Sequence, residues 1–359
     1  MKINFPKLNS RSVVGLDVGS SSVKAVELTA KSKGGNFELN HLGVAPVAPE
    51  AIVQGAFLNS GAITEAIREA IDAGKIKSKN VAAAVSGHSV IVKKVSLPIM
   101  TRDELDEQIR WEAEQYIPFD VNEVNLDFQI LDSANDESHM EVLLVAAKKD
   151  LIDDYVQVIV EAGLNPVAID VAAFAVENAF ELNYDAANRG TVALVNIGAQ
   201  VVNINILANG VPCFTRDITT AGNQYTEEIQ KALSISFDEA ERIKLGGRAS
   251  DGQDVVPREV EQAMQSITET VIGEISRSLD FFAATSADSR IEKVYLTGGA
   301  SRVSGLATAF AERTGLAVDT LNPLARMLPS SKYDQDYLDD MAPSLAVGVG
   351  LAMRREEAQ

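Results

Sequence analysis

The sequence is poor in the residues that build disulfides and zinc sites. One cysteine, Cys213, occurs among 359 residues, so no disulfide can form within the chain. A low cysteine content is typical of proteins in a reducing compartment. The three histidines, His41, His88 and His139, lie far apart and none has a cysteine near it in the sequence. This spacing disfavours a zinc site.

Positive charge is also scarce. The chain has 32 lysines and arginines against 51 aspartates and glutamates, which gives a net charge of -19. A protein that binds nucleic acid needs basic surface to neutralise the phosphates, so this balance argues against DNA or RNA as a ligand. The balance does not exclude ATP, because proteins hold its phosphates with backbone N–H groups and a metal ion.

Long apolar runs are missing as well. No stretch reaches the ~18 apolar residues that a membrane helix needs, and the mildly basic N-terminus lacks the apolar core of a signal peptide. We therefore expect a cytoplasmic protein that reaches a membrane only through a partner. The length and the 46% hydrophobic content predict two globular lobes, each large enough for its own core.

An internal repeat is the clearest pattern that is present. Residues 13–28 read VVGLDVGSSSVKAVEL, and residues 192–207 read VALVNIGAQVVNINIL. Each segment predicts a strand, a glycine-containing turn and a second strand. Asp17 and Gly19 match Asn196 and Gly198, half a chain apart. The two halves are therefore expected to share one topology.

A third glycine turn occurs near the end of the chain. Residues 297–301 read TGGAS, after a β-like run and before a helical pattern. A strand, a glycine pair and a helix N-terminus in this order can hold a phosphate or a nucleoside. Further on, residues 341–353 predict a buried closing helix, in which Gly348 and Gly350 let another helix come close.

Residues 86–164 predict a small α/β unit inserted into the first lobe. Thr101 and Glu104 form a capping box at the start of a helix that carries Trp111, the one tryptophan of the chain, with Tyr116 close behind. Aromatic residues at helical spacing belong to a core more often than to an interface. An interface stays open, because the β-like run 90–97 is a candidate sheet edge for a partner peptide.

These patterns predict four structural units. The core of lobe I comprises residues 1–85, 165–190 and 342–359, with residues 86–164 as the inserted subdomain. The core of lobe II comprises residues 191–225 and 286–341, with residues 226–285 as its helical subdomain.

Five motifs in this order resemble the actin/Hsp70/hexokinase superfamily. Residues 15–28 (GLDVGSSSVKAVEL) resemble its first phosphate loop, residues 194–204 (LVNIGAQVVNI) its second, and residues 294–306 (VYLTGGASRVSGL) its adenosine motif. Residues 170–179 and 346–352 stand where its two connecting helices belong. The resemblance implies an α/β, actin-like (ribonuclease H-like) fold with two duplicated lobes and, as in the division protein FtsA, an inserted subdomain.

Residues 94–98 (KVSLP) and 112–131 (EAEQYIPFDVNEVNLDFQIL) resemble more specifically the PilM family of type IV pilus assembly proteins. That resemblance implies ATP in the interlobe cleft, and the cytoplasmic N-terminal tail of the membrane protein PilN in a groove between lobe I and the insertion. Other pilus alignment proteins and assembly ATPases would be indirect partners, and a homodimer stays open.

The superfamily resemblance assigns a ligand role to most polar residues of the three turns. Asp17 would hold Mg²⁺ through a water molecule, since magnesium keeps several waters. Asp17 and Asp170 are the catalytic candidates, although Asp170 also suits a helix N-cap. Glu241 and Lys244 would face the ribose, with a surface ion pair as the alternative. The residues expected to contact the nucleotide are Gly19, Ser20, Ser21, Ser22, Lys24, Asn196, Gly198, Glu241, Lys244, Gly298 and Gly299.

Asn196 departs from the superfamily pattern, which has an acidic residue there. An amide can bind a metal-bound water but supplies no charge, and Gln200 is larger than the usual loop residue. Slow or absent ATP hydrolysis is therefore expected, in a nucleotide-responsive scaffold.

The alternative functions are an FtsA-like filament-forming ATPase and a small-molecule kinase of the same fold. The end of the chain directly after the closing helix leaves no room for the membrane-anchoring tail of FtsA-like proteins, which favours PilM.

Overall fold

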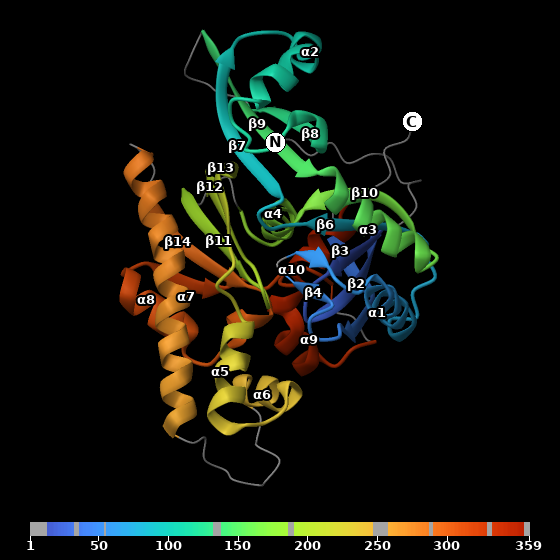
Figure 1. Ribbon diagram of the computed structural model, residues 1–359, viewed down its shortest axis with the longest axis vertical. Helices are drawn as coiled ribbons and strands as arrows, with labels where there is room; N and C mark the ends of the chain where they lie inside the picture. The colour runs from blue at the N-terminus through green and yellow to red at the C-terminus, as the bar shows by residue number, and fades with distance from the viewer. Residues whose placement is uncertain are drawn as a thin grey trace.

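The computed structural model describes residues 13–31, 36–53, 55–131, 138–185, 190–246, 258–286, 290–328 and 332–354. This part of the chain forms two five-stranded sheets, a three-stranded sheet and a two-stranded ribbon. Figure 1 shows the two large sheets side by side, with the three-stranded sheet above them.

The first large sheet has the strand order β10-β6-β1-β2-β3. β1 pairs antiparallel with β2 and parallel with β6. The apolar residues of β1 and β6 are buried, as expected for strands covered on both faces. The strands are β1 (Val14–Val18), β2 (Ser22–Lys31), β3 (Asn36–Pro46), β6 (Asn80–Val85) and β10 (Asn165–Val171).

The second large sheet repeats this topology, with the order β13-β12-β11-β14-β15. β11 pairs antiparallel with β12 and parallel with β14, as β1 does with β2 and β6. The duplication predicted from the sequence repeat is therefore present. The strands are β11 (Thr191–Ile197), β12 (Val202–Ala208), β13 (Val211–Ile218), β14 (Ile291–Thr297) and β15 (Ala317–Thr320).

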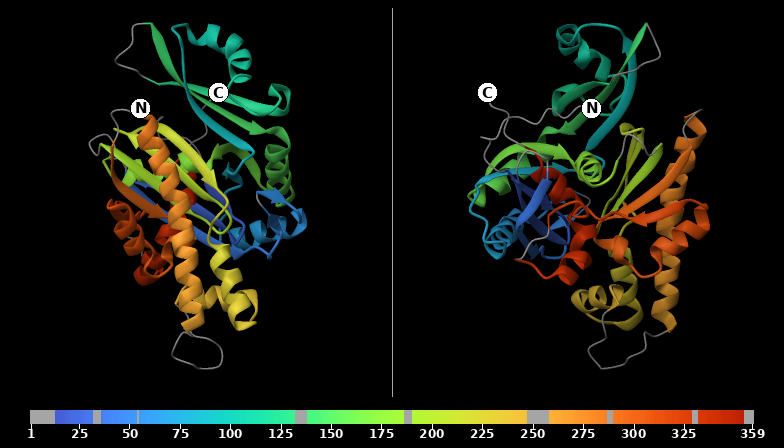
Figure 2. Two further views of the ribbon diagram at one scale, coloured as in Figure 1. Left: turned by 60° about the vertical axis from the view of Figure 1, so that its left-hand side comes forward. Right: turned by 180° about the vertical axis from the view of Figure 1, so that it is seen from behind.

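Two helices lie between the sheets and belong to both cores. α4 (Ala172–Asn183) and α10 (Ala346–Ala352) share one apolar cluster with residues of β2, β6, β11 and β14. On the outer faces, α1 (Ser60–Ala73) and α3 (Lys149–Glu161) cover the first sheet. α7 (Arg258–Thr285) and α8 (Leu306–Thr314) cover the second, and Figure 2 shows α7 running along its whole height.

Shorter elements close the ends of the molecule. α5 (Asn223–Leu233) and α6 (Phe237–Lys244) pack against the start of α7. The ribbon of β4 (Ile52–Val53) and β5 (Ala56–Phe57), the helix α9 (Gln335–Met341) and the turns η4 (Gly299–Arg302) and η5 (Ala342–Leu345) complete the two halves. No helix in the described ranges is both long and apolar enough to span a bilayer.

The small unit is a three-stranded antiparallel sheet with one helix on its face. Its order is β7-β9-β8, formed by β7 (Val90–Pro98), β9 (His139–Lys148) and β8 (Val124–Leu131). The capping box predicted at Thr101 and Glu104 begins α2 (Arg102–Ala113). Leu105, Ile109 and Ala113 of α2 are buried against the sheet.

The tryptophan of α2 contradicts the expectation of a core role. The Trp111 side chain is 73% exposed, and Tyr116 after the helix is 37% exposed. The burial pattern of α2 explains this, because Leu105, Ile109 and Ala113 form its inner stripe and Trp111 lies off it.

The helix α3 packs on the first large sheet. Leu151, Tyr155, Val158 and Ile159 join the cluster that lies under β1 and β6. The cluster of the three-stranded sheet contains none of these four residues. We therefore propose that the inserted unit ends near residue 148, and that α3 belongs to lobe I.

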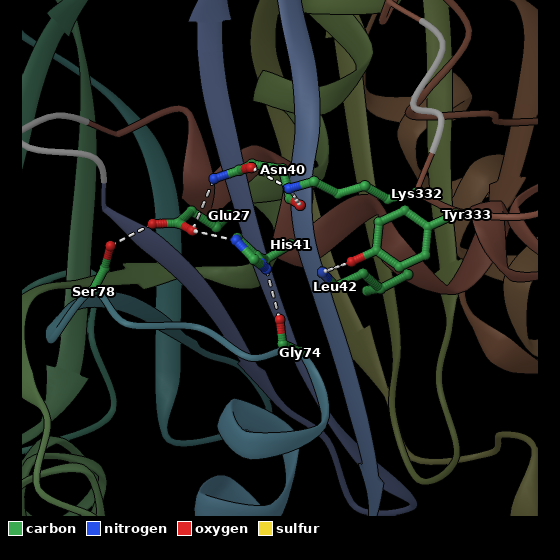
Figure 3. A network of polar contacts seen from close by, with 8 residues as sticks. All are labelled: Glu27, Asn40, His41, Leu42, Gly74, Ser78, Lys332 and Tyr333. Carbon is green, nitrogen blue, oxygen red and sulfur yellow. Dashed lines mark hydrogen bonds and ion pairs between the residues drawn. The ribbon is translucent and has the colours of Figure 1, made fainter.

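A polar network secures the outer edge of the first sheet (Figure 3). Glu27 on β2 is 6% exposed, and its carboxylate accepts hydrogen bonds from Ser78 Oγ and Asn40 Nδ2. His41 lies between this carboxylate and the carbonyl that follows α1, with Nδ1 at 2.7 Å from that carbonyl. Lys332 donates to Asn40. These contacts satisfy a buried charge, which would otherwise be costly.

The two glycines of the closing segment lie where a neighbouring element comes close: the backbone of α4 at Gly350 and a side chain of β2 at Gly348. A Cβ at Gly350 would lie 1.7 Å from the carbonyl oxygen of Ala175 on α4, and one at Gly348 would lie 2.8 Å from Val26 on β2. Gly350 therefore allows the predicted helix approach, whereas Gly348 faces a strand. The closing segment is a 3-10 turn followed by a short helix.

Replacing Gly350 by alanine is expected to lower the free energy of unfolding by about 2 kcal/mol or more, because overpacking here meets backbone that cannot rotate away. Gly61 of α1 is the matched control, since a Cβ there meets nothing closer than 3.6 Å. Urea titration of both variants checks this, with Gly61→Ala unchanged or slightly stabilised. Equal stability of Gly350→Ala and wild type would contradict the packing argument.

Candidate functional site

A cleft of about 340 Å³ lies between the two lobes, and it is lined by all three predicted turns. Its lining includes residues of the β1–β2 turn, the β11–β12 turn and the Gly298-Gly299 turn, together with residues of α6 and α10. The predicted residues that line it are Asp17, Gly19, Ser20, Ser21, Ser22, Lys24, Asn196, Gly198, Glu241, Lys244, Gly298 and Gly299. The turns therefore converge as expected, and the role of each residue as a ligand stays a prediction.

The first turn places charge at the cleft. Gly19 N–H donates to the Ser22 carbonyl at 3.2 Å, which closes the turn. Lys24 Nζ lies 3.1 Å from Asp17 Oδ2 across the hairpin, and both side chains are largely buried. This places an ammonium and a carboxylate together beside a turn whose serines also line the cleft.

The second turn has the same backbone and different side chains. Gly198 N–H donates to the Val201 carbonyl at 2.9 Å, the counterpart of the Gly19 bond. At the positions of Asp17 and Lys24 stand Asn196 and Asn203, and Asn196 Nδ2 donates to Asn203 Oδ1 at 2.9 Å. The second turn therefore presents a neutral amide pair where the first presents an ion pair.

The third turn requires glycine. Gly298 has φ of 89°, a left-handed conformation that favours glycine. A Cβ on Gly298 would also lie 2.4 Å from the Ile197 carbonyl oxygen. Its N–H donates to the Pro343 carbonyl at 2.7 Å, which ties the turn to the segment before α10. Gly299 begins η4 and has open space beside it, with nothing nearer a Cβ than 3.8 Å.

Lys244 does not belong to a surface ion pair, which was the alternative to a ribose contact. Its side chain is 3% exposed, and Nζ donates to Glu241 Oε2 at 2.6 Å and to Thr226 Oγ1 at 3.1 Å. Burial lowers the pKa of the Lys244 ammonium, and the Glu241 carboxylate opposes that shift. The pair therefore forms a fixed, charge-compensated wall at the α5–α6 side of the cleft.

The charges of the lining suit an anion. Lys24, Lys244 and Arg302 line the cleft against the two carboxylates Asp17 and Glu241, in a chain that carries a net charge of -19. No group of three or more His, Cys, Asp or Glu in the described ranges could hold a metal ion. Asp17 alone suits Mg²⁺ that is held mainly by water and phosphate oxygens.

Asp170 lies outside this set of lining residues. It is the next-to-last residue of β10, and α4 begins only after Val171, so the helix N-cap alternative is wrong. Its Oδ1 accepts from Val171 N–H, and its Oδ2 lies 2.6 Å from Arg354 Nε. The structure therefore does not bring Asp170 together with the three turns.

Two residues of the cleft were missed or undervalued in the sequence. Gln200 Nε2 donates to the Ile52 carbonyl at 2.7 Å, so the side chain predicted only as bulky spans the cleft from one lobe to the other. Asn203 also lines the cleft. The repeat could have revealed it, because Asn203 stands where the first half has Lys24.

A second, smaller hollow of about 190 Å³ opens on the other side of Asn203. We call it the β7 groove. β7 and β13 are both edge strands of their sheets and lie side by side here. The groove is lined by Gly87, His88, Val90, Ile91, Val92, Lys93, Val171, Ala173, Asn203, Thr215, Arg216 and Asp217.

The comparison with protein families decides the affiliation. The family described as "Type IV pilus assembly protein PilM" matches residues 15–356, which is nearly the whole chain. This chain belongs to the PilM family. The match agrees with the resemblance seen at residues 94–98 and 112–131.

Curated relatives of this PilM-family chain are cell division proteins. It is 25% identical to FtsA of Bacillus subtilis over 262 residues, which cover 66% of the chain and 58% of that protein. FtsA of Staphylococcus epidermidis is 22% identical over 263 residues, which cover 64% of the chain and 53% of that protein. The chain spans a little over half the length of these relatives.

Solved structures show the same fold. The PilM-PilN type IV pilus biogenesis complex matches with a TM-score of 0.84 and 28% identity, over 96% of this chain and 98% of that one. Ethanolamine utilization protein EutJ from Carboxydothermus hydrogenoformans matches with a TM-score of 0.57 and 15% identity, over 97% of this chain and 91% of that one. MreB5 of Spiroplasma citri bound to ADP matches with a TM-score of 0.50 and 13% identity, over 95% of this chain and 94% of that one. The fold of the PilM-family chain is therefore actin-like.

Behind the cleft, a buried carboxyl joins α4 to the second sheet. Glu177 accepts from Asn205 Nδ2 at 2.9 Å. Burial raises the pKa of Glu177 to about 8, while the hydrogen bond from Asn205 works against that shift. A carboxyl with this pKa is largely protonated at neutral pH and needs no cationic partner.

The Glu177→Gln variant is expected to gain thermal stability relative to wild type as the pH rises. The folded-state pKa of Glu177 is raised, so its stabilising contribution is complete below pH 4.5 and is lost as the pH rises through 8. Glutamine stays neutral, so the difference in Tm should be small at pH 5 and largest near pH 9. Glu261→Gln on the exposed face of α7 is the control. Parallel pH profiles for wild type and Glu177→Gln would contradict the pKa assignment.

Proposed function

We propose that this PilM-family chain is a cytoplasmic scaffold of type IV pilus assembly. In this role it binds ATP and Mg²⁺ in the interlobe cleft and holds the cytoplasmic tail of PilN at the β7 groove. The observation that carries the nucleotide part is the convergence of two paired β-turns and a glycine turn on one cleft. Turns of this kind bring backbone N–H groups and dipoles to a polyphosphate.

The lining residues fit a magnesium nucleotide. Lys24 would pair with a phosphate oxygen, and Asp17 would hold Mg²⁺ through a water molecule. The turn at Gly298 would let the backbone approach the base, and Glu241 and Lys244 would contact the ribose. MreB5, which shares this fold, has been solved with ADP and with AMPPNP. When bound, Mg²⁺ would neutralise phosphate charge.

Slow or absent hydrolysis follows from the same residues. Hydrolysis needs a group that positions or deprotonates the attacking water. Asn196 offers no charge and its amino group is bonded to Asn203, while Asp170 is held by Arg354 outside the cleft. The two carboxylates among the described residues that line the cleft, Asp17 and Glu241, are each paired with a lysine, which disfavours a small-molecule kinase.

The PilN tail is assigned to the β7 groove because that groove is bordered by open strand edges. An extended peptide can pair with the edge of β7 and place its apolar side chains against Val90 and Val92. The solved PilM-PilN complex supports PilN as the partner. The scaffold would then sit at the inner membrane through PilN, without a membrane segment of its own in the described ranges.

Replacing Lys24 by methionine is expected to weaken MgATP binding by about tenfold, which is the loss of one charge-assisted hydrogen bond to phosphate. Isothermal titration calorimetry with wild type and variant checks this. Lys231→Met on the exposed face of α5 removes the same charge away from the cleft and should leave the affinity unchanged. An unchanged affinity of Lys24→Met would refute the phosphate role, and no MgATP binding by wild type would refute the nucleotide site.

Replacing Val92 by glutamate is expected to weaken binding of a synthetic PilN tail peptide by about tenfold or more, because it puts a charge into the apolar wall of the groove. Ser96→Glu is the matched control: it adds the same charge on the same strand and the same face, beyond the groove. Fluorescence anisotropy with a labelled peptide measures both. Equal loss in the two variants, or loss only in Ser96→Glu, would place the tail elsewhere.

A further inference from the structure

The two halves of the molecule differ most at one cross-strand pair. Asp17 faces Lys24 in the first hairpin, and Asn196 faces Asn203 in the second, at the same register. The charged pair ends at its own hairpin, because Lys24 faces Val44 on the third strand. The neutral pair does not end at its hairpin, because Asn203 faces the polar residue Asp217 on β13, the third strand of its sheet.

That residue extends the pair into a chain of hydrogen bonds that runs from the cleft to the β7 groove. Asn203 Nδ2 donates to Asp217 Oδ1 at 2.8 Å. Asp217 Oδ2 accepts from Gly87 N–H at 2.5 Å. Asn196 lines the cleft, Asp217 and Gly87 line the β7 groove, and Asn203 lines both.

The direction of this chain is fixed at its far end. A carboxylate can only accept and a backbone N–H can only donate, so Asn203 must turn its amino group to Asp217 and its oxygen to Asn196. Asn196 must then donate a hydrogen bond from its amino group to Asn203 and point its oxygen towards Gly298. That oxygen lies 2.5 Å from where a Gly298 Cβ would be. The group that Asn196 shows the cleft is therefore set by Asp217.

The last bond of the chain also crosses between the lobes. Gly87 lies in the connection between β6 of the first sheet and β7, whereas Asp217 belongs to β13 of the second sheet. The two walls of the groove are thus carried by different lobes. A change in the lobe angle changes the width of the groove and this hydrogen bond together.

We propose that Asn196, Asn203, Asp217 and the Gly87 amide form a relay that couples nucleotide in the cleft to peptide in the β7 groove. The proposal rests on the proposed function and names its regulation. A ligand that favours the bonded arrangement at Asn196 stabilises the narrow groove, and a peptide in the groove raises nucleotide affinity by the same factor. These are positioning residues, since they act through one another.

The relay also accounts for the missing acidic residue of the second turn. A carboxylate at position 196 could only accept, so Asn203 would have to turn its amino group to it. The Asn203 oxygen would then face the Asp217 carboxylate, and these two buried acceptors would have no donor between them. Asparagine at 196 and aspartate at 217 are therefore matched to each other.

Hydrogen exchange with MgATP as the probe tests the relay without a peptide. In wild type, MgATP should slow exchange about tenfold, within the usual range of coupling, both in residues 17–24 of the cleft and in residues 87–93 of the groove wall. In Asn203→Ala, only the cleft should be protected. The control Asn183→Ala, which removes another buried asparagine that lines neither hollow, should keep both effects.

Exchanging the ends of the relay tests its direction. Asn196→Asp should abolish protection of the groove wall, because it leaves two acceptors facing one another. Asp217→Asn should also abolish it, because Asn203 and Asn196 would both turn over and Asn196 would show the cleft its amino group instead of its oxygen. The double variant Asn196→Asp/Asp217→Asn restores a complete chain that runs the opposite way, with Gly87 donating to the new amide oxygen. It should recover thermal stability and groove protection, which a purely structural role for either residue would not produce.

The outcomes separate the two proposals. No cleft protection in wild type would overturn the nucleotide site and the relay with it. Cleft protection without groove protection in wild type, or groove protection that persists in Asn203→Ala, would overturn the relay alone. If Asn203→Ala fails to fold, the variants at positions 196 and 217 decide. Single variants that retain groove protection would also overturn the relay, as would a double variant that folds without groove protection.

Discussion

The close contact between α4 and α10 is the constraint on which the rest of the structure depends. Because Gly350 has no side chain, the two helices meet backbone to backbone and form one thin layer that both sheets share. A shared layer of this kind fixes the distance between the sheets while it lets them rotate about it. The hairpin turns of the two halves therefore end opposite one another, with a cleft between them.

The duplicated halves have diverged where their side chains meet the cleft. The backbones of the two turns remain equivalent, down to the bond between Gly19 and Ser22 and its counterpart at Gly198 and Val201. One turn keeps an ion pair that ends locally, and the other has an amide pair whose bonds continue into the next strand. Equivalent folds thus carry different chemistry: one turn is suited to charge, and the other to communication with a distant surface.

Much of this architecture could be predicted from the sequence, because it rests on local patterns. The repeat predicted the twin hairpins, and the capping box at Thr101 predicted the start of α2. Pairings between distant segments were beyond reach. Nothing local shows that Arg354 pairs with Asp170, that Gln200 bonds to Ile52 or that α3 packs on the first large sheet. Trp111 was misjudged because a shift of two residues along a helix decides whether a side chain faces the sheet or water, and Trp111 lies two residues from the buried Ile109 and Ala113.

The exposure of Trp111 has a spectroscopic consequence. It is the one indole of the chain, and it stands on α2 with 73% of its surface open to solvent, away from the cleft and the β7 groove. Its emission is therefore that of a solvated fluorophore in the folded protein. Quenching or a blue shift of this emission would report that another molecule has covered the tip of the small unit, whatever happens between the lobes.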